Sequence, residues 1–274
     1  MSSSSSRSSH DYVHIKEGTA VMKYNKAEAV FYNKVQVFNR DISIQVIRLF
    51  SEIRIREKEE LYEKKMKRYQ DCLLKSGSND PNNKPPNDFL KQFSIKILDA
   101  LAATGLRSIR YLKEIDNVSQ VTINDLDPKA TEQALQNATE NNIESSKINI
   151  RTGDAIMYMY DVSRDPFRHY DVVDLDPYGS AAPFLDSAVQ AVADGGLLCV
   201  TCTDTAILAG NYPEVCFAKY SAVSVKATYC HEMSLRILLH SIESAATKYK
   251  VFISTPTFIS IYQHFLMILL LSAT

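Results

Sequence analysis

The sequence predicts an α/β fold in which helices cover both faces of a parallel sheet. Two observations lead to this prediction. Short apolar runs alternate with helix-length segments from residue 94 to about residue 250, a rhythm typical of parallel sheets. Acidic residues also stand at or just after predicted strand ends, at Asp99, Asp125, Asp154 and Asp176. That edge of a parallel sheet is where ligands bind.

The elements of this core are expected in a regular order. Strands are predicted at 94–99, 121–125, 148–151, 171–175 and 197–203, which are short, apolar and rich in β-branched residues. Helices are predicted between and after them, at 105–114, 128–141, 181–192 and about 226–248. Together they define a core at residues 94–250.

An extension at residues 11–93 precedes the core. An alternating stretch around Gly18 suggests strand structure, and apolar residues at helical spacing over 42–69 predict one long helix. Residues 75–88 are rich in Gly, Pro, Asn and Asp, which predicts a flexible insertion. Residues 1–10 are mostly serine and predict a disordered tail, with a mitochondrial presequence as the alternative.

Composition sets limits on the class of protein. The chain has 274 residues, 45% of them hydrophobic and 23% charged, which are ordinary values for one large globular domain or a domain with an extension. A net charge of −1 does not indicate a nucleic-acid binder, so a polyanion would need a local basic patch. Five cysteines without a secretory signal favour reduced thiols in an intracellular compartment.

Cys199 and Cys202 form a C-x-x-C pattern, but we expect no metal there. Both fall within the predicted strand at 197–203. Side chains three positions apart in a strand point to opposite faces. Because no second pair with ligand spacing follows, no metal site is predicted.

The turn from Asp99 to Arg107 predicts the kind of cofactor. It contains one glycine, Gly105, whereas the dinucleotide fingerprint needs three glycines to admit a pyrophosphate. An acid in the same turn favours a small zwitterionic ligand with a cationic centre. S-adenosylmethionine is the common ligand of that description.

Two further acids are assigned to this ligand. Asp125 lies 20 residues after Gly105, the spacing of an acid that accepts both ribose hydroxyls. The alternative is that Asp125 serves the next helix as an N-terminal acid ahead of Pro128, a role that Asp127 fits equally well. Asp154 would hold the adenine amino group from the following loop.

The segment Asp176-Pro177-Tyr178 follows an apolar strand and suits chemistry on the amino group of a nucleobase. Such an amine is a poor nucleophile because its lone pair is delocalised into the ring. Hydrogen bonds to Asp176 and to a carbonyl near Pro177 would return electron density to the nitrogen, while Tyr178 stacks on the base. The alternative is a turn with Asp as the N-cap and Pro at the first helical position.

Several blocks together resemble the tRNA (guanine-N2-)-dimethyltransferase family, over residues 11 to about 250. The resemblance implies a Rossmann-like class I S-adenosylmethionine-dependent methyltransferase with an N-terminal strand/helix extension. The blocks are Phe31-Tyr-Asn33, Phe38-Asn-Arg-Asp41, Asp99-Ala-Leu-Ala-Ala-Thr-Gly-Leu-Arg107, Asn124-Asp125, Gly153-Asp-Ala155, Asp176-Pro-Tyr-Gly-Ser180, Thr201-Cys-Thr-Asp204, Asn211-Tyr-Pro213 and Lys226-Ala-Thr-Tyr-Cys-His-Glu232.

The resemblance also implies an activity and its residues. One or two methyl groups would pass from S-adenosylmethionine to the exocyclic N2 of guanine 26 in tRNA. Asp176, Pro177 and Tyr178 would be the catalytic residues. The cofactor would be held by Arg40, Arg107, Asp125, Asp154 and Ala155, with the two arginines on its carboxylate.

Partners and compartment follow from the same resemblance. The expected partner is tRNA, with no membrane and no obligate protein partner. The expected location is the nucleus, with the mitochondrion as the alternative.

Residues 251–274 depart from the family pattern. They contain no Asp, Glu, Lys or Arg and include seven consecutive apolar residues at 265–271, too few to span a bilayer. The family's further C-terminal domain is absent from this sequence. We therefore expect a truncated or frame-shifted product whose last two sheet strands are imperfect or missing.

Two other functions stay open at this point. One is a catalytically silent protein that binds S-adenosylmethionine. The other is an amino-methyltransferase acting on another base, since an Asp-Pro-aromatic site also suits adenine N6 or cytosine N4.

Overall fold

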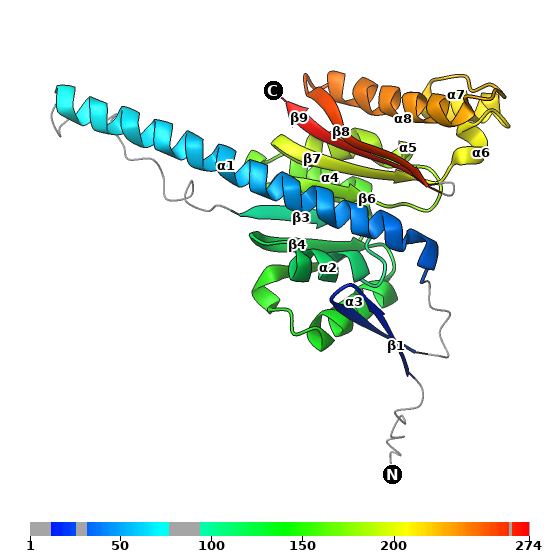
Figure 1. The fold of residues 1–274 in the computed structure, drawn as a ribbon, viewed down its shortest axis with the longest axis horizontal. Coiled ribbons are helices and arrows are strands. Elements are labelled where there is room, and N and C mark those ends of the chain that lie inside the picture. Colours follow the sequence, from blue (N-terminus) through cyan, green and yellow to red (C-terminus); the bar gives the residue numbers. More distant parts are fainter. Residues whose placement is uncertain (1–11, 26–31, 77–93, 263–264, 274) are drawn as a thin grey trace, which may run out of the picture.

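The computed structural model describes residues 12–25, 32–76, 94–262 and 265–273. At its centre is a seven-stranded sheet with the order β5-β4-β3-β6-β7-β9-β8 (Figure 1). The strands are β3 (Ile95–Asp99), β4 (Val118–Asp125), β5 (Ile148–Thr152), β6 (Tyr170–Leu175), β7 (Val192–Cys202), β8 (Phe252–Tyr262) and β9 (Phe265–Ala273). Strands β3 to β7 are parallel, and β9 is antiparallel to both of its neighbours.

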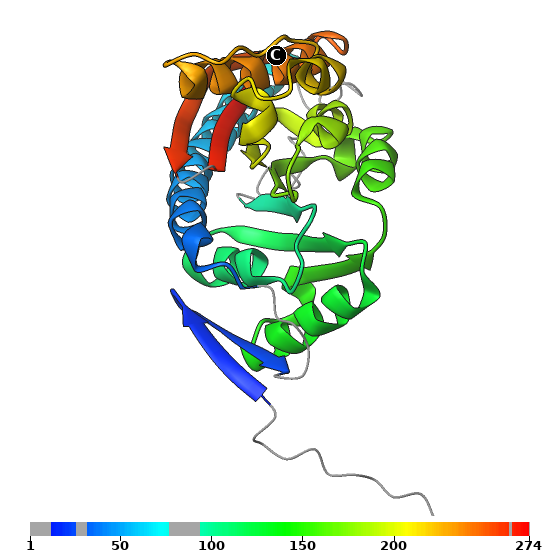
Figure 2. The same cartoon turned by 90° about the vertical axis from the view of Figure 1, so that its right-hand side faces the viewer.

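Helices cover both faces of the sheet, as predicted. One face carries α1 (Val37–Ser76), α2 (Leu106–Glu114) and α3 (Pro128–Glu140), and the other carries α4 (Ala155–Ser163), α5 (Ala182–Ala191) and α8 (Cys230–Thr247) (Figure 2). Two short helices, α6 (Thr205–Leu208) and α7 (Pro213–Tyr220), follow β7. The adjacent residues Val172 and Val173 belong to different hydrophobic cores, because successive strand side chains point to opposite faces.

The strand order reverses beside β3. The chain continues from β3 outward through β4 and β5, then returns to add β6 and β7 on the other side of β3. This arrangement is Rossmann-like, and a crevice forms at the carboxyl ends of the strands where the order reverses. The ends of β3 and β6 therefore mark the position of the candidate site.

Every strand and helix predicted for the core is present, with shifted ends, but the helices α4, α6 and α7 were not predicted. Helix α8 begins at Cys230 rather than near residue 226, and β7 begins at Val192 rather than at 197. The first turn of α4 is capped by Asp154. Its buried residues recur at helical spacing and are Ala155, Tyr158, Met159 and Val162.

The C-terminal segment, where we expected strands that are imperfect or missing, forms two strands of the sheet, and the pairing of β8 is irregular. Strand β9 pairs with β7 along its length, and β8 pairs with β9. The β8–β9 register shifts around Pro256, because proline has no N–H for the ladder. Since β9 lies between two other strands, its apolar, uncharged sequence is typical of an interior strand.

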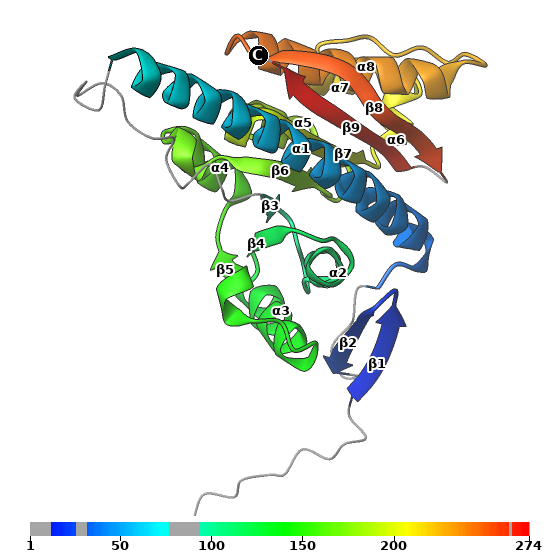
Figure 3. The same cartoon turned by 60° about the vertical axis from the view of Figure 1, so that its left-hand side comes forward.

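The N-terminal extension is a hairpin followed by a long helix, as predicted. Strands β1 (Tyr12–Glu17) and β2 (Ala20–Asn25) pair around a turn at Gly18, whose φ is +54°. Figure 3 shows this hairpin beside α3 and shows α1 crossing the sheet. Most of the predicted insertion at 75–88 and the predicted tail at 1–10 lie outside the described residues.

Two asparagines of the α3 region hold the hairpin by its backbone. Asn141 accepts a hydrogen bond from Val21 N at 2.9 Å and donates to Val21 O at 2.6 Å. Asn137 accepts from Lys23 N at 2.9 Å.

Within the described ranges no helix is long and apolar enough to cross a bilayer.

Replacement of Asn141 by alanine should loosen this contact. The backbone N–H and C=O of Val21 would lose two part-buried hydrogen bonds, each with a net contribution of about 0.5–1.5 kcal/mol, so about 1–3 kcal/mol together. We expect urea unfolding to show a loss of that size for Asn141→Ala. Glu132→Ala, on the exposed side of α3, should stay within about 0.5 kcal/mol of wild type. Equal losses in the two variants would contradict this view.

Candidate active site

A cavity of about 560 Å³ opens at the reversal of strand order. It brings six of the predicted site residues together, from α1, α2 and the ends of β4 and β6. They are Arg40, Arg107, Asp125, Asp176, Pro177 and Tyr178. Apolar side chains that sequence reasoning did not single out complete the lining, among them Leu101, Leu126 and Phe184.

The turn after β3 forms one wall and is tightly folded. Ala103 has a φ of +47° although it is not glycine, a conformation that carries backbone strain and is common at functional sites. Gly105 has a φ of +79°, and a Cβ there would lie 3.0 Å from the Ala134 Cβ. The single glycine of the turn is therefore needed where α2 begins against α3.

Asp125 is held in place by backbone donors of this wall. Its Oδ2 accepts from Ala103 N at 2.8 Å, and its Oδ1 accepts from Asp127 N at 2.9 Å. The N-cap of α3 is Asp127, which accepts from Lys129 N. Asp127 therefore fills the N-cap position of α3, and the Asp125 carboxylate retains acceptor capacity beside the cavity.

Asp154 and Ala155 lie at the next strand end but are not among the residues that line the cavity. Asp154 is the N-cap of α4, accepting from Ile156 N at 2.7 Å. Its loop adjoins the Asp125 strand, because Gly153 N donates to Asp125 O at 2.9 Å. The assignment of Asp154 and Ala155 to the adenine stays a prediction.

Asp176 points its carboxylate at Arg107. The Arg107 Nε and Nη2 donate to Asp176 Oδ2 at 3.1 and 2.8 Å. The other oxygen, Oδ1, is buried and has no hydrogen-bond partner among the described residues. No helix begins at Pro177, since α5 starts at Ala182, so the reading of Asp176 as an N-cap is wrong.

The segment after Asp176 is fastened to the end of β7. Gly179 N donates to the Thr203 hydroxyl at 2.9 Å, and Thr203 N donates to Gly179 O at 2.9 Å. Tyr178 is 74% exposed beside the cavity. This fixed turn presents an aromatic ring at the mouth of the site.

Beneath Arg107 lie two buried acids: Asp99, which the sequence placed at the rim of strand ends, and Asp174, which the sequence analysis did not single out. Asp99 and Asp174 are in register on neighbouring parallel strands, and each is 1% exposed. Tyr111 donates to Asp174 Oδ2 at 2.6 Å, and the Ser108 hydroxyl donates to Asp99 at 2.7 Å. An acid inside a strand of valines and leucine is the sequence signal by which Asp174 could have been found.

The pKa values of these acids reflect burial. Burial, reinforced by the charge of Asp174, raises the pKa of Asp99 to about 7. Burial also raises the pKa of Asp174, although Arg107 and Tyr111 oppose the shift. With Asp176 nearby, one guanidinium faces three carboxyl groups, so a proton on Asp99 relieves the repulsion at neutral pH and below.

Arg40, the second arginine expected to hold a carboxylate, is already paired. Its Nε and Nη2 donate to the two oxygens of Glu17 at 2.6 and 2.5 Å. Arg110 donates to the same carboxylate at 2.8 Å. Burial raises the pKa of Glu17, but Arg40 and the other donors outweigh it and leave the pKa below its usual value. Arg40 therefore joins the hairpin to the cavity wall.

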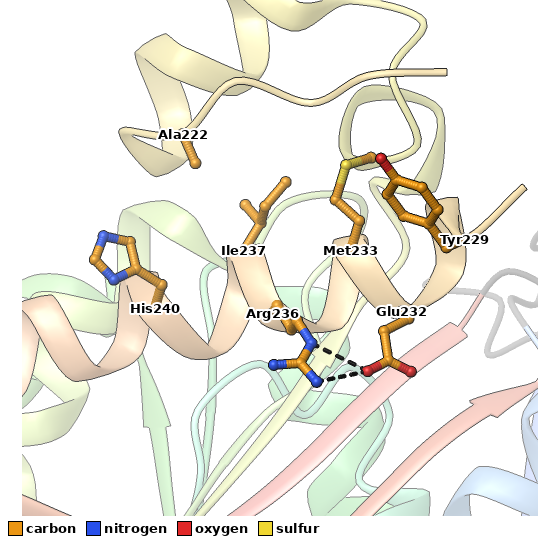
Figure 4. A pocket seen from close by; sticks show the side chains of 7 residues that line it. All are labelled: Ala222, Tyr229, Glu232, Met233, Arg236, Ile237 and His240. Carbon is orange, nitrogen blue, oxygen red and sulfur yellow. Dashed lines mark hydrogen bonds and ion pairs between the residues drawn. The ribbon is translucent and has the colours of Figure 1, made fainter. Parts of the chain in front are cut away.

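A second cavity, of about 610 Å³, lies along α8 (Figure 4). Its two charged residues of opposite sign, Glu232 and Arg236, form a hydrogen bond of 2.7 Å with each other, and no acid from a strand end lines it.

Within the described ranges no group of three or more His, Cys, Asp or Glu is placed to hold a metal. Cys199 and Cys202 lie in opposite cores, as predicted.

The charged and apolar side chains that line the first cavity fit a nucleoside that carries a zwitterionic amino-acid group. A carboxylate at the end of β4 suits ribose hydroxyls, and a guanidinium at the base suits a carboxylate. Apolar side chains between them suit a purine ring. The sheet order and this cavity define a protein of the Rossmann-like class to which S-adenosylmethionine-dependent methyltransferases belong.

Comparison with known proteins specifies the family. A family model described as N2,N2-dimethylguanosine tRNA methyltransferase matches residues 11–272. The chain belongs to this family.

Individual relatives agree with the family match. The chain is 42% identical over 257 residues to a tRNA (guanine(26)-N(2))-dimethyltransferase of Schizosaccharomyces pombe, covering 86% of this chain and 44% of the relative. A mitochondrial enzyme of that name from Saccharomyces cerevisiae is 38% identical over 255 residues, covering 88% of this chain and 44% of the relative. The chain thus spans less than half the length of these curated relatives.

A solved structure supports the fold. Trm1 from Pyrococcus horikoshii, in complex with S-adenosyl-L-methionine, superposes with a TM-score of 0.73 at 27% identity, covering 95% of this chain and 61% of that one.

The raised pKa of Asp99 predicts how stability depends on pH. The unfolded value is about 3.9, so the folded state binds the extra proton between there and about pH 7. The stabilising effect of that proton is complete below about pH 4 and is lost as the pH rises through 7, by at most about 1.4 kcal/mol per pH unit.

Asp99→Asn removes this titration. We expect its free energy of unfolding, relative to wild type, to rise between pH 5 and pH 8 in urea melts. Asp194→Asn, an exposed acid on β7, should show no such trend. Parallel curves for wild type and Asp99→Asn would contradict the assignment.

Proposed function

We propose that this chain transfers one or two methyl groups from S-adenosylmethionine to the exocyclic N2 of guanine 26 in tRNA. The observation that carries the proposal is the Asp176 carboxylate at the reversal of strand order, with one buried oxygen that has no partner among the described residues. The names of the relatives and the cofactor of Trm1 support it. Because those relatives are more than twice as long, the activity of these 274 residues needs its own test.

The cofactor would lie across the wall formed by the turn after β3. Asp125 would accept hydrogen bonds from the ribose hydroxyls, and Arg107 with Arg40 would hold the carboxylate. Asp154 and Ala155 would contact the adenine from the adjoining loop. When bound, S-adenosylmethionine supplies a methyl group on a positively charged sulfur.

Asp176 would act on the guanine amine. Its uncommitted Oδ1 would accept an N–H of N2, and a carbonyl near Pro177 would accept the other, which strengthens the nitrogen as a nucleophile. As the N2–carbon bond forms, the sulfur–methyl bond breaks, and N2 passes its proton to Asp176. Much of the rate should come from holding the base in line with the methyl group.

Guanine 26 is part of folded tRNA, so it must leave its stack to enter the cavity. Tyr178, which lines the cavity and is exposed, would stack on the extruded base. Because the net charge of the chain is −1, local basic groups would have to bind the phosphates of the tRNA.

For the compartment, we propose the nucleus on the family resemblance. The mitochondrion is the alternative, because one relative is named as a mitochondrial enzyme. Fluorescent tagging of the chain at its C-terminus would distinguish the two.

Methyl transfer by this chain tests the proposed function directly. With labelled S-adenosylmethionine and unmodified tRNA, Asp176→Ala should lower the rate by about 10²–10⁴-fold, the usual contribution of a positioned acid or base. A tRNA with adenine in place of guanine 26 should accept no label.

The possible outcomes separate the three functions. Loss of label in both controls supports the proposal. Label in the adenine-containing tRNA, or in DNA, would favour another base as substrate. Absence of transfer with cofactor binding retained would favour a silent protein.

Tyr178 is expected to contribute through its ring rather than its hydroxyl. Tyr178→Ala should weaken productive tRNA binding by about 1–3 kcal/mol, the range for stacking of one base. Tyr178→Phe should behave like wild type. Steady-state KM for tRNA would measure both, and equal defects in the two variants would argue against stacking.

A further inference from the structure

Arg107 uses both edges of its guanidinium. Its Nε and Nη2 donate to Oδ2 of Asp176 at 3.1 and 2.8 Å. On the other edge, Nη1 donates to the Ser43 hydroxyl at 3.1 Å and lies 3.5 Å from Oδ2 of Asp174. Since the N–H groups form a rigid fork, one edge holds a residue of the cavity while the other is anchored in the interior.

The interior edge is anchored by three elements. Asp174 belongs to β6, Ser43 to α1, and Tyr111 of α2 donates to Asp174 at 2.6 Å. Asp174 lies within the sheet, where an isolated charge would be costly. These contacts hold the guanidinium in place independently of what its outer edge binds.

The outer edge holds Asp176 by one oxygen only. Both N–H groups donate to Oδ2, and in the described part of the chain Oδ1 has no partner. Asp176 is the residue proposed to take the guanine amine, and Arg107 is the residue proposed to take the cofactor carboxylate. Two carboxylates therefore compete for one edge of one guanidinium.

We infer that Arg107 couples the two ligands of the site: the carboxylate of S-adenosylmethionine replaces Asp176 on its outer edge, and Asp176 is released toward the guanine amine. Asp174 is the positioning residue that keeps Arg107 at the base of the cavity during this exchange. The inference rests on the proposed function, because it requires the cavity to bind that cofactor.

The exchange predicts a change in ligand affinity that can be measured without tRNA and without methyl transfer. Binding of a ligand carboxylate must first break the Arg107–Asp176 pair, so Asp176 lowers the affinity for that carboxylate. Removal of the Asp176 charge should therefore strengthen binding of a ligand with the carboxylate, but not of a ligand without it.

Two ligands with the same thioadenosine part distinguish these cases. S-adenosylhomocysteine carries the carboxylate, whereas 5′-methylthioadenosine lacks the amino-acid moiety. By calorimetry on the 274-residue chain, Asp176→Asn should bind S-adenosylhomocysteine about 5- to 50-fold more tightly, within the usual range of coupling between sites. Its affinity for 5′-methylthioadenosine should stay within about twofold of wild type, because that ligand makes no use of Arg107.

Three further variants control the result. Asp174→Asn should weaken S-adenosylhomocysteine alone, because Arg107 loses its anchor. Asp125→Asn should weaken both ligands equally, since both carry the ribose. Glu232→Gln, in the second cavity, should change neither. Thermal unfolding of each variant shows whether it is folded under the conditions of the titration.

Unchanged or weaker binding of S-adenosylhomocysteine by folded Asp176→Asn would overturn the exchange. Methyl transfer to tRNA by wild type, combined with that result, would leave the proposed function standing and remove the exchange alone. Failure of wild type and Asp176→Asn to bind either ligand would overturn both.

Discussion

The buried pairing of Arg107 with acids on β6 is the interaction on which the site depends. Asp174 lies on β6 and Asp176 follows directly after the strand, two positions further on, and both side chains lie on the side that α2 covers with Arg107. Asp99 stands beside Asp174 on the next strand. Three carboxyl groups in so small a volume cannot all be charged without a cation between them. The guanidinium therefore makes the acidic strand end compatible with a folded core.

The N-terminal extension is part of the site rather than an appendage to it. Glu17 at the end of β1 bonds to Arg40 on α1 and to Arg110 on α2. Arg40 and Tyr32 in turn line the cavity. Because these charges are buried and satisfied mainly by one another, displacement of the hairpin would leave both arginines without their shared partner. The hairpin and the cavity wall are therefore expected to form and to move together.

Much of the fold was predictable from short-range patterns. Apolar runs and helical periodicity predicted every strand of the parallel core and four of its helices, but not α4, α6 or α7. The acids at strand ends predicted the rim that carries the cavity. Helix α4 was missed because a second methionine and a second tyrosine, Met157 and Tyr160, lie outside its buried stripe and mask the helical period in so short a segment. The final strands were expected to be imperfect or missing because an uncharged run was compared with a family pattern, but β9 is an interior strand, which has no need of charge.

By itself, the sequence determined the order of strands and helices, the residues at the strand ends and the family, because these depend on periodicity and on motifs within a few residues. Only the tertiary structure decided which groups meet. That Asp127 rather than Asp125 caps α3 depends on backbone geometry. That Arg107 holds Asp176 and rests on Asp174 depends on the packing of α2 against β6, elements about 65 residues apart in the chain. Contacts over such separations are set by packing, and local patterns carry no record of them.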